Sequence, residues 1–306
     1  MPHSSKPLDR LAVAIMLVLC ASWGFNQIAA KVALADIPPI TQSALRSLGA
    51  TLVLGAYAAW RERAVFQADK SFWPGVAAGL IFGAEFICLY LAVQWTSAGR
   101  AVVFLYSAPF FVALGVFAFV PQERLSPLQW IGMALAFAGV ATALAGSSGG
   151  TGLLGDALAV LAAAGWGAVT VMTKATTLGR IPPTKTLLYQ LSISAVLCAV
   201  AAYVAGEKWP THLSALSAAA MLYQTFWVAS LTYLAWFWLL KRYPAGELSA
   251  FTFLAPVVGV FASRILLDEP LSPRFLAALA MVAAGILLVN WPARLGANFR
   301  GGWRSK

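Results

Sequence analysis

The sequence predicts an all-α integral membrane protein with ten transmembrane helices, arranged as two inverted five-helix repeats. Of its 306 residues, 60% are hydrophobic and 10% are charged, against about 25% charged in soluble domains. This is too much apolar surface for one water-soluble core. The apolar runs lack the alternation of barrel strands, and backbone polar groups in lipid must be satisfied internally, so these runs are predicted to be helices.

The two halves of the chain carry the same landmarks in the same order. The offset between matching residues stays between 143 and 147. The matching pairs are Trp23-Gly24 and Trp166-Gly167, Lys31 and Lys174, Gly99 and Gly246, Pro109 and Pro256, Glu123 and Glu269, and Gly139 and Gly285. Because each half holds an odd number of membrane-length segments, the halves must cross the bilayer in opposite orientations. Transporters with a binding site between their repeats are built in this way.

Ten apolar segments approach the roughly 20 residues that a helix needs to cross the hydrocarbon core. In the first half they span 11–34, 40–60, 72–94, 98–119 and 127–145. In the second half they span 153–175, 184–205, 213–239, 245–266 and 273–292. We expect two repeat domains, 11–145 and 153–292, with 1–10 and 293–306 as cytoplasmic tails.

Proline and glycine punctuate these segments and shape their interiors. Pro38-Pro39 and Pro182-Pro183 separate the first two segments of each half. Within the third segment, Gly75, Gly79 and Gly83 form a smooth stripe that predicts close helix packing, with sliding during transport as the alternative. Pro109 and Pro256 occupy matching positions, and each removes a backbone hydrogen bond, which predicts a kink.

The placement of Lys and Arg predicts the orientation in the membrane. With a cytoplasmic N-terminus, fifteen of these residues face the cytoplasm and five face the other side, with Arg46 inside the second segment. We therefore expect an inner-membrane protein with both termini in the cytoplasm. The net charge of +10 therefore reflects mostly the basic residues on the predicted cytoplasmic side. No nucleic-acid partner is predicted, because the basic residues are scattered singly between membrane segments.

The reactive residues do not form a catalytic or metal-binding set. Cys20, Cys88 and Cys198 lie in separate segments, and the histidines, His3 and His212, lie in a tail and a loop. No metal, cofactor or enzymatic activity is therefore predicted. The expected partners are a small-molecule substrate and the lipid bilayer. A monomer is compatible with this organisation, but the residues leave the oligomeric state open.

The first repeat resembles the EamA repeat of the drug/metabolite transporter superfamily. The likeness covers nearly the whole first half and includes Ser22-Trp23-Gly24-Phe25-Asn26, Ala44-Leu45-Arg46, Tyr90-Leu91-Ala92, Thr96-Ser97-Ala98 and Glu123-Arg124-Leu125. The second half is similar but looser, with Gln190 where the first copy has Arg46. Glu85 with Ile87-Cys88 is similar to the branch of aromatic amino-acid exporters of the YddG type.

This resemblance implies a ten-helix carrier that works by alternating access through a central cavity. It also implies export of small amphipathic metabolites, in particular amino acids with apolar or aromatic side chains. Trp23 and Trp166 occupy matching positions on helices that the resemblance places along the cavity. Their faces suit a flat side chain and an ammonium group, with packing in the core as the alternative.

Other residues complete the predicted substrate site. Glu85 is an acid roughly 20 Å from the cytoplasmic edge by helical rise, and it could contact the substrate ammonium, accept a proton, or pair with Arg46 or Lys31. Glu247 could balance Lys241 and Arg242. The full predicted set is Trp23, Asn26, Gln27, Glu85, Tyr90, Tyr106, Trp166, Thr170, Gln224 and Trp227.

Three alternative functions remain at this point. A multidrug efflux pump for cationic compounds, of the same superfamily, would need more than one deeply buried acid, and Glu85 is the acid far from any predicted helix end. A passive channel would conduct ions without exchanging substrate. A membrane-embedded enzyme would need a cluster of His, Asp or Cys at one membrane surface.

Overall fold

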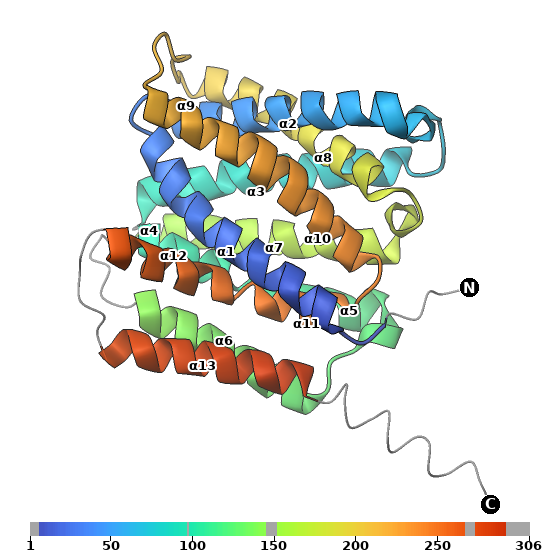
Figure 1. Cartoon of the computed structure of the whole chain (residues 1–306), viewed down its shortest axis with the longest axis vertical. Helices are drawn as coiled ribbons and strands as arrows, with labels where there is room; N and C mark the ends of the chain where they lie inside the picture. The colour runs from blue at the N-terminus through green and yellow to red at the C-terminus, as the bar shows by residue number, and fades with distance from the viewer. Residues whose placement is uncertain (1–5, 97, 145–151, 267–272, 292–306) are drawn as a thin grey trace, which may run out of the picture.

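The computed structural model describes residues 6–96, 98–144, 152–266 and 273–291, and within these ranges the regular structure is helical. The helices lie side by side and run across the view of Figure 1. The first half contains α1 (Arg10–Ala33), α2 (Pro39–Arg61), α3 (Phe72–Trp95), α4 (Ala98–Leu105), α5 (Ala108–Phe119) and α6 (Pro127–Leu144), with 3-10 turns η1 (Arg63–Phe66) and η2 (Pro121–Glu123).

The second half repeats this series. It contains α7 (Leu153–Ala175), the 3-10 turn η3 (Thr177–Gly179), α8 (Pro183–Val204), α9 (Ala215–Leu222), the π-helix η4 (Tyr223–Thr232), α10 (Tyr233–Leu240), α11 (Ala245–Phe251), α12 (Leu254–Leu266) and α13 (Pro273–Asn290). Each of the ten predicted segments is helical, and its ends agree with the prediction to within two residues. Proline at the first turn of α2 and α8 marks two of these starts.

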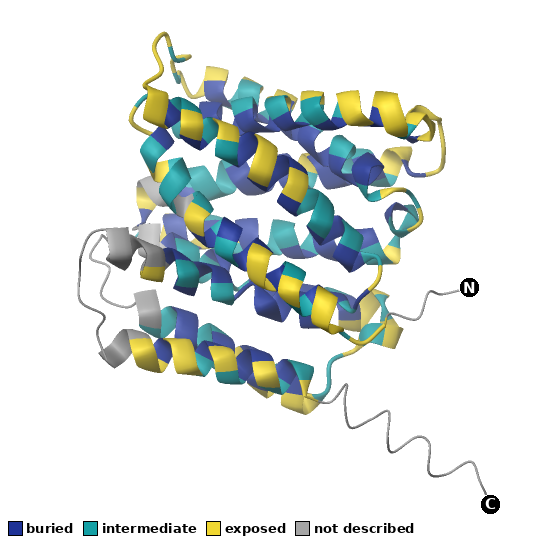
Figure 2. Ribbon diagram, viewed as in Figure 1, coloured by how far each residue is buried: buried dark blue, intermediate teal, exposed yellow. Residues whose placement is uncertain are grey.

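Five of the described helical stretches are long and apolar enough to cross a membrane. They are Arg10–Ala33, Phe72–Ala92, Ala101–Phe119, Leu153–Ala175 and Pro183–Val204, and three shorter apolar helices accompany them. Figure 2 shows exposed residues on the outward faces of the helices and buried residues between them. Large apolar side chains such as Leu52, Trp60 and Trp73 are exposed. This outer surface suits lipid rather than water.

The helix contacts are related by exchange of the two halves. Helix α1 packs against α12, and its repeat partner α7 packs against α5. Helix α3 packs against α7. The matching contact joins η4, which belongs to the repeat partner of α3, to α1. The pairs α2 with α8 and α6 with α13 each join an element to its own repeat partner. The structure thus has the two-repeat architecture that the sequence predicts.

Matching glycines allow these contacts to be close. A Cβ atom on Gly24 would lie 2.7 Å from the Ala255 carbonyl oxygen, and one on Gly167 would lie 2.6 Å from the Phe111 Cβ. On α3, a Cβ atom on Gly79 would lie 2.7 Å from the Tyr189 carbonyl oxygen of α8. The stripe on α3 therefore serves helix packing in this structure.

The α6–α13 contact gives a direct test of this packing. A Cβ atom on Gly285 would lie 2.6 Å from the Ala136 backbone nitrogen, whereas one on Gly55 of α2 would meet nothing within 4 Å. We expect Gly285→Val to lower the thermal unfolding midpoint of the detergent-solubilised protein, because overpacking costs about 1–3 kcal/mol. Gly55→Val is the matched control and is expected to leave the midpoint nearly unchanged. Equal midpoints for the two variants would contradict the packing.

The fourth and ninth predicted segments are both broken next to their prolines, as predicted. Helix α4 ends at Leu105 and α5 begins at Ala108, just before Pro109. Helix α11 ends at Phe251 and α12 begins at Leu254, just before Pro256. Carbonyl groups at the breaks accept hydrogen bonds from side chains: the Ser107 hydroxyl donates to the Phe104 carbonyl at 2.6 Å, and the Cys20 thiol donates to the Phe251 carbonyl at 3.1 Å.

The π-helix η4 is a feature that the sequence did not predict. Its wider turn is closed in part by the Ser230 hydroxyl, which donates to the Thr225 carbonyl at 2.8 Å. The repeat partner of this segment, α3, is a regular α-helix. The two halves therefore differ here, and π-helical turns often mark functional positions.

Asp69, in the loop before α3, ties that loop to the start of α8. Lys185 donates from Nζ to the Asp69 Oδ2 at 2.8 Å and to the Gln67 carbonyl at 2.6 Å, and the Ser71 backbone nitrogen donates to Asp69 Oδ1 at 2.8 Å. The hydrogen bonds from Lys185 and then Ser71 lower the pKa of Asp69 to about 2.

The low pKa predicts how stability depends on pH. An Asp in an unfolded chain has a pKa of about 3.9, so the folded state gains stability above that pH and loses it as the pH falls toward 2. We expect the thermal unfolding midpoint of the wild type to fall more steeply between pH 5 and pH 3 than that of Asp69→Asn. Parallel curves for the two proteins would show that Asp69 carries none of this dependence.

Candidate substrate site

Aromatic side chains from both repeats meet in the interior of the bundle. The rings of Trp23 on α1 and Trp166 on α7 lie edge to face, with their centroids 6.5 Å apart. Tyr106, at the break between α4 and α5, lies 5.8 Å from Trp166. Three of the predicted site residues are therefore in direct ring contact, although they are separated by up to 143 positions in the chain.

Helix α10 adds two rings that the predicted set left out. Tyr233 and Trp236 lie 6.4 Å and 5.7 Å from Trp23, and the Trp23 indole donates to the Thr232 hydroxyl at 3.0 Å. Their spacing of three residues on one helix face is the signal that could have identified them. We call Trp23, Tyr106, Trp166, Tyr233 and Trp236 the aromatic cluster. Because its members come from both repeats, it lies where the halves meet.

Glu85 lies beside this cluster on α3. A Cβ atom on Gly165, the residue before Trp166, would lie 3.3 Å from the Glu85 Cβ. The Glu85 side chain is 9% exposed, and Arg46 is close enough to interact with it electrostatically. However, the ion pairs found in the described part of the chain do not include the predicted pairing of Glu85 with Arg46 or Lys31. Lys31 is exposed at the end of α1.

The other predicted residues differ in how far they are buried and in the contacts that they make. Thr170, one turn after Trp166, is buried, and Tyr90 is half-buried and interacts electrostatically with Arg46. Asn26 has a buried Oδ1 atom for which the described residues supply no hydrogen-bond partner. Gln224 is buried but directs its amide to the Met221 sulfur at 3.8 Å. The side chain of Gln27 lies outside the described part of the structure.

Trp227, in the π-helix η4, contacts α1 next to the aromatic cluster. It is 40% exposed, and its indole donates to the Ser22 hydroxyl at 2.8 Å. Tyr223, one turn earlier in the π-helix, donates to the Ser22 carbonyl at 2.9 Å. These two side chains anchor η4 to α1 immediately before Trp23. A substrate contact through Trp227 stays a prediction.

Buried charges link several elements at the end of the bundle where α1 begins, which we call the N-terminal end. Lys174 on α7 donates from Nζ to Glu123 Oε1 at 2.7 Å and to the Tyr243 carbonyl at 2.6 Å. The other oxygen of Glu123 accepts from the Ala245 backbone nitrogen at 2.8 Å. The Lys174 and Glu123 side chains are only 10% and 5% exposed. Together they join η2, α7 and the start of α11.

The N-terminal segment adds to the contacts at this end. The Tyr243 hydroxyl donates to Asp9 Oδ2 at 2.8 Å, and Asp9 Oδ1 accepts from the Ala12 backbone nitrogen at the start of α1. The hydrogen bonds from Ala12 and then Tyr243 lower the pKa of Asp9. These contacts tie α1, α7 and α11 together at the N-terminal end.

Glu247 does not balance Lys241 and Arg242 as predicted. Lys241 donates to the Ile181 carbonyl, and the Arg242 guanidinium lies 3.9 Å from the centre of the Trp238 ring. Glu247 instead lies near Glu123, and its Oε2 atom is buried without a hydrogen-bond partner among the described residues. The sequence could not show this, because the turn before α11 directs the two cations away from the carboxylate.

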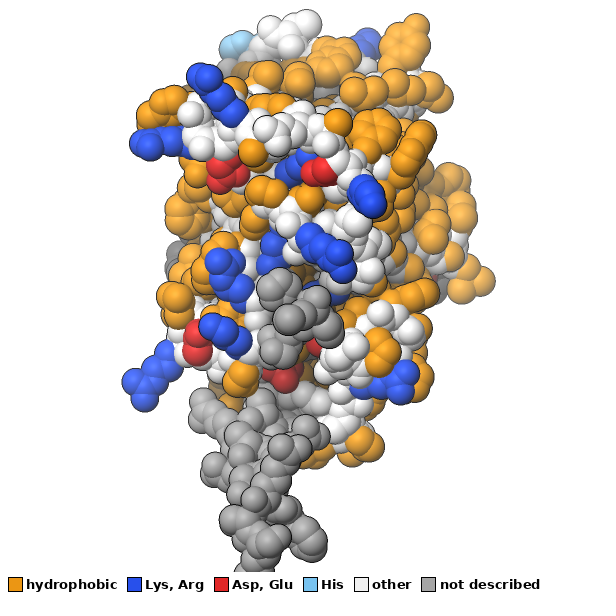
Figure 3. All heavy atoms as spheres, turned by 90° about the vertical axis from the view of Figure 1, so that its right-hand side faces the viewer, with side chains coloured by type: hydrophobic (Ala, Val, Ile, Leu, Met, Phe, Trp, Pro, Cys, Tyr) orange, Lys and Arg blue, Asp and Glu red, His pale blue; other side chains and the backbone are white. Residues whose placement is uncertain are grey.

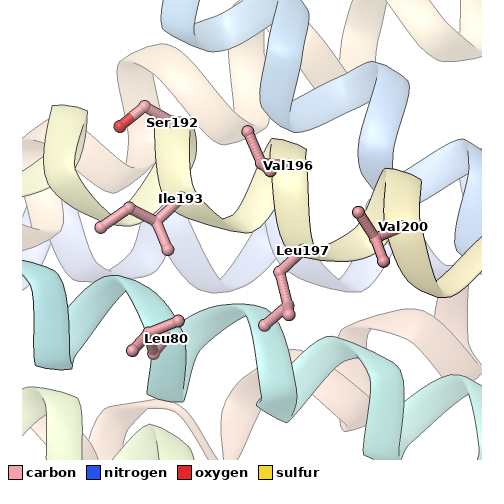
Figure 4. A pocket seen from close by; sticks show the side chains of 6 residues that line it. All are labelled: Leu80, Ser192, Ile193, Val196, Leu197 and Val200. Carbon is pink, nitrogen blue, oxygen red and sulfur yellow. The ribbon is translucent and has the colours of Figure 1, made fainter.

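An apolar groove of about 450 Å³ lies between α3 and α8, away from the aromatic cluster. Figure 4 shows its lining: Leu80, Ser192, Ile193, Val196, Leu197 and Val200. Its one polar side chain, Ser192, already donates to the Leu188 carbonyl at 2.6 Å. Val196 and Val200 are more than half exposed on the outer surface. The groove suits a lipid chain, not a charged metabolite.

No group of three His, Cys, Asp or Glu side chains that could hold a metal occurs among the described residues. A multi-pass helical membrane protein with two matching repeats, and with an aromatic and charged cluster between them, has the architecture of a transporter. The model of the EamA-like transporter family matches residues 10–145 and 153–291. The chain belongs to this family.

Several proteins of known sequence are similar along nearly their whole length. The uncharacterised transporter YvbV of Bacillus subtilis is 30% identical, with 93% of each chain covered. The "Probable amino-acid metabolite efflux pump" of Salmonella typhimurium is 28% identical over 90% of this chain and 93% of its own. The Escherichia coli protein of the same name is 27% identical over 92% and 95%.

A solved crystal structure has the same fold. It superimposes with a TM-score of 0.79 and 20% sequence identity, over 92% of this chain and 96% of that chain. At this level of identity the likeness concerns the fold alone. It supports the helix arrangement described above and leaves the substrate to be inferred from the site.

Proposed function

We propose that this transporter exports small amphipathic metabolites, in particular amino acids with apolar or aromatic side chains. The observation that carries the proposal is the aromatic cluster at the contact of the two repeats, with Glu85 beside it. The names of the Salmonella and Escherichia coli relatives support the same class of substrate.

The chemistry of the cluster suits such a substrate. The faces of Trp23 and Trp166 can hold a flat side chain, and the negative face of an aromatic ring attracts an ammonium group. Glu85 provides a carboxylate for the same ammonium. A charge inside the membrane costs at least about 2.5–3.5 kcal/mol on insertion scales, so an acid kept at this depth is a functional candidate.

The proposed orientation is an inner-membrane protein with both termini in the cytoplasm. Figure 3 views the N-terminal end and shows Lys and Arg side chains distributed over it, bordered by hydrophobic surface. Such an excess of cations is typical of a cytoplasmic face. With this orientation, the lock formed by Lys174, Glu123 and Tyr243 closes the cytoplasmic side. Transport then requires the lock to open so that substrate can reach the cluster, and the halves to rock about their contact.

The test is uptake by purified protein in proteoliposomes with a panel of amino acids. We expect vesicles loaded with an unlabelled aromatic amino acid to accumulate the labelled compound by exchange. A pH gradient applied to the same vesicles separates proton antiport from facilitated diffusion. Exchange of lipophilic cations without exchange of any amino acid would overturn the proposal in favour of a cationic-compound pump.

A further inference from the structure

Arg46 on α2 is a charged side chain whose hydrogen bonds are incomplete. It is 2% exposed, and its Nε and Nη2 atoms are buried without a partner among the residues that the structure describes. Its guanidinium carbon lies 4.2 Å from the centre of the Phe86 ring. Burial of a cation without full hydrogen bonding is destabilising. The side chain is therefore held ready for a partner that the described chain does not supply.

The neighbours of Arg46 connect it to the aromatic cluster. Tyr233, whose ring lies 6.4 Å from that of Trp23, interacts with the guanidinium. Glu85 interacts with it electrostatically but forms no ion pair with it, although both side chains are described. A guanidinium and a carboxyl group thus lie at the edge of the cluster without forming a direct ion pair with each other. A zwitterionic head group has the opposite charges needed to bridge them.

The second repeat shows that the fold does not require a charge at this position. Gln190 on α8 occupies the place in the second repeat that Arg46 occupies in the first, and it is fully buried. A neutral amide therefore suffices for the equivalent helix. The positive charge is therefore particular to the first repeat, where the Arg46 guanidinium can attract an anion.

We propose that Arg46 binds the carboxylate of the transported substrate, while Glu85 receives its ammonium group. This inference rests on the proposed function and narrows the substrate class to compounds that carry a carboxylate together with an ammonium group. The planar guanidinium can donate two parallel hydrogen bonds to a carboxylate, a geometry that lysine cannot reproduce. Carboxamide or decarboxylated analogues lack the group that Arg46 recognises.

The experiment measures ligand-induced thermal stabilisation of the purified transporter by phenylalanine, phenylalaninamide and phenethylamine. We expect the wild type to bind phenylalanine at least about 10-fold more tightly than either analogue, as expected for a charge-assisted hydrogen-bonded contact. Arg46→Gln is expected to weaken phenylalanine binding about 10- to 100-fold and to leave phenethylamine binding unchanged, so that the preference disappears. Arg46→Lys is expected to retain part of it.

Arg61→Gln is the matched control. Arg61 lies on the same helix and its guanidinium also covers an aromatic ring, 4.0 Å from the centre of Trp60, but it is exposed at the helix end. The Arg61→Gln variant should keep the wild-type preference for phenylalanine over the two analogues. If Arg46→Gln does not fold, Arg46→Lys decides, because it keeps the charge and loses the paired donors. An Arg46 variant with the full wild-type preference would overturn this inference alone. A wild type that binds and exchanges no amino acid would overturn the proposed function as well.

Discussion

Replacement of Trp23 by alanine is expected to reduce amino-acid exchange in proteoliposomes by at least about 10-fold. The substitution removes ring contacts to Trp166, Tyr233 and Trp236 and the hydrogen bond to Thr232. Trp23 is half-buried, so its loss also costs stability, up to the about 3–5 kcal/mol of a fully buried Trp. Exchange must therefore be normalised to the amount of folded protein, measured by size-exclusion chromatography and thermal unfolding.

Two further variants separate the site from the fold. Trp23→Phe keeps a ring for the substrate and loses only the indole donor, so we expect intermediate exchange with near-normal stability. Trp60→Ala, on the lipid-facing side of α2 where Trp60 is 71% exposed, is expected to exchange like the wild type. Wild-type exchange by Trp23→Ala would remove Trp23 from the substrate site.

Removal of Glu123 is expected to have the second large effect. Glu123→Gln leaves the Lys174 ammonium in its buried position without an ion-pair partner, and the loss of one member of a buried pair costs about 3–5 kcal/mol. We expect a lower thermal unfolding midpoint and slower exchange, because the proposed alternating access needs a conformation in which the N-terminal end is closed. Lys174→Met is expected to act in the same direction.

Exchanging the two charges tests whether Glu123 and Lys174 act as a pair. Glu123→Lys combined with Lys174→Glu should recover part of the stability and exchange that each single reversal loses. Asp69→Asn removes the ion pair between Asp69 and Lys185. It should have a smaller effect at neutral pH, because the Asp69 side chain is 38% exposed. Additive losses in the swapped protein would contradict a direct coupling between Glu123 and Lys174.

The helices of this fold could be predicted closely because the membrane restricts the choices. Each apolar run had to be a helix of about 20 residues, and Pro39, Pro183 and the matched pair Pro109 and Pro256 marked starts and breaks. The π-helix η4 could not be predicted from the sequence pattern; in the structure, Tyr223 and Trp227 of this segment contact Ser22 across the helix interface. The spacing of apolar residues along the chain does not predict such contacts between helices.

The site was predicted in part for a similar reason. Repeat symmetry placed Trp23 and Trp166 together, and the structure brings them into contact. Symmetry could not predict Tyr233 and Trp236, because their orientation follows from the end of the π-helix. It also could not show that Arg46 and Glu85 interact without pairing, since pairing depends on side-chain geometry rather than on depth in the membrane.

The central claim is that substrate binds between the two repeats, against the aromatic cluster. Photolabelling of the reconstituted transporter with a photoreactive phenylalanine analogue, followed by mass spectrometry of the labelled peptides, tests this most directly. We expect labels on peptides from α1 and α7 that contain Trp23 and Trp166, and we expect excess phenylalanine to suppress them. Labels confined to one repeat, or to the lipid-facing groove between α3 and α8, would contradict the account.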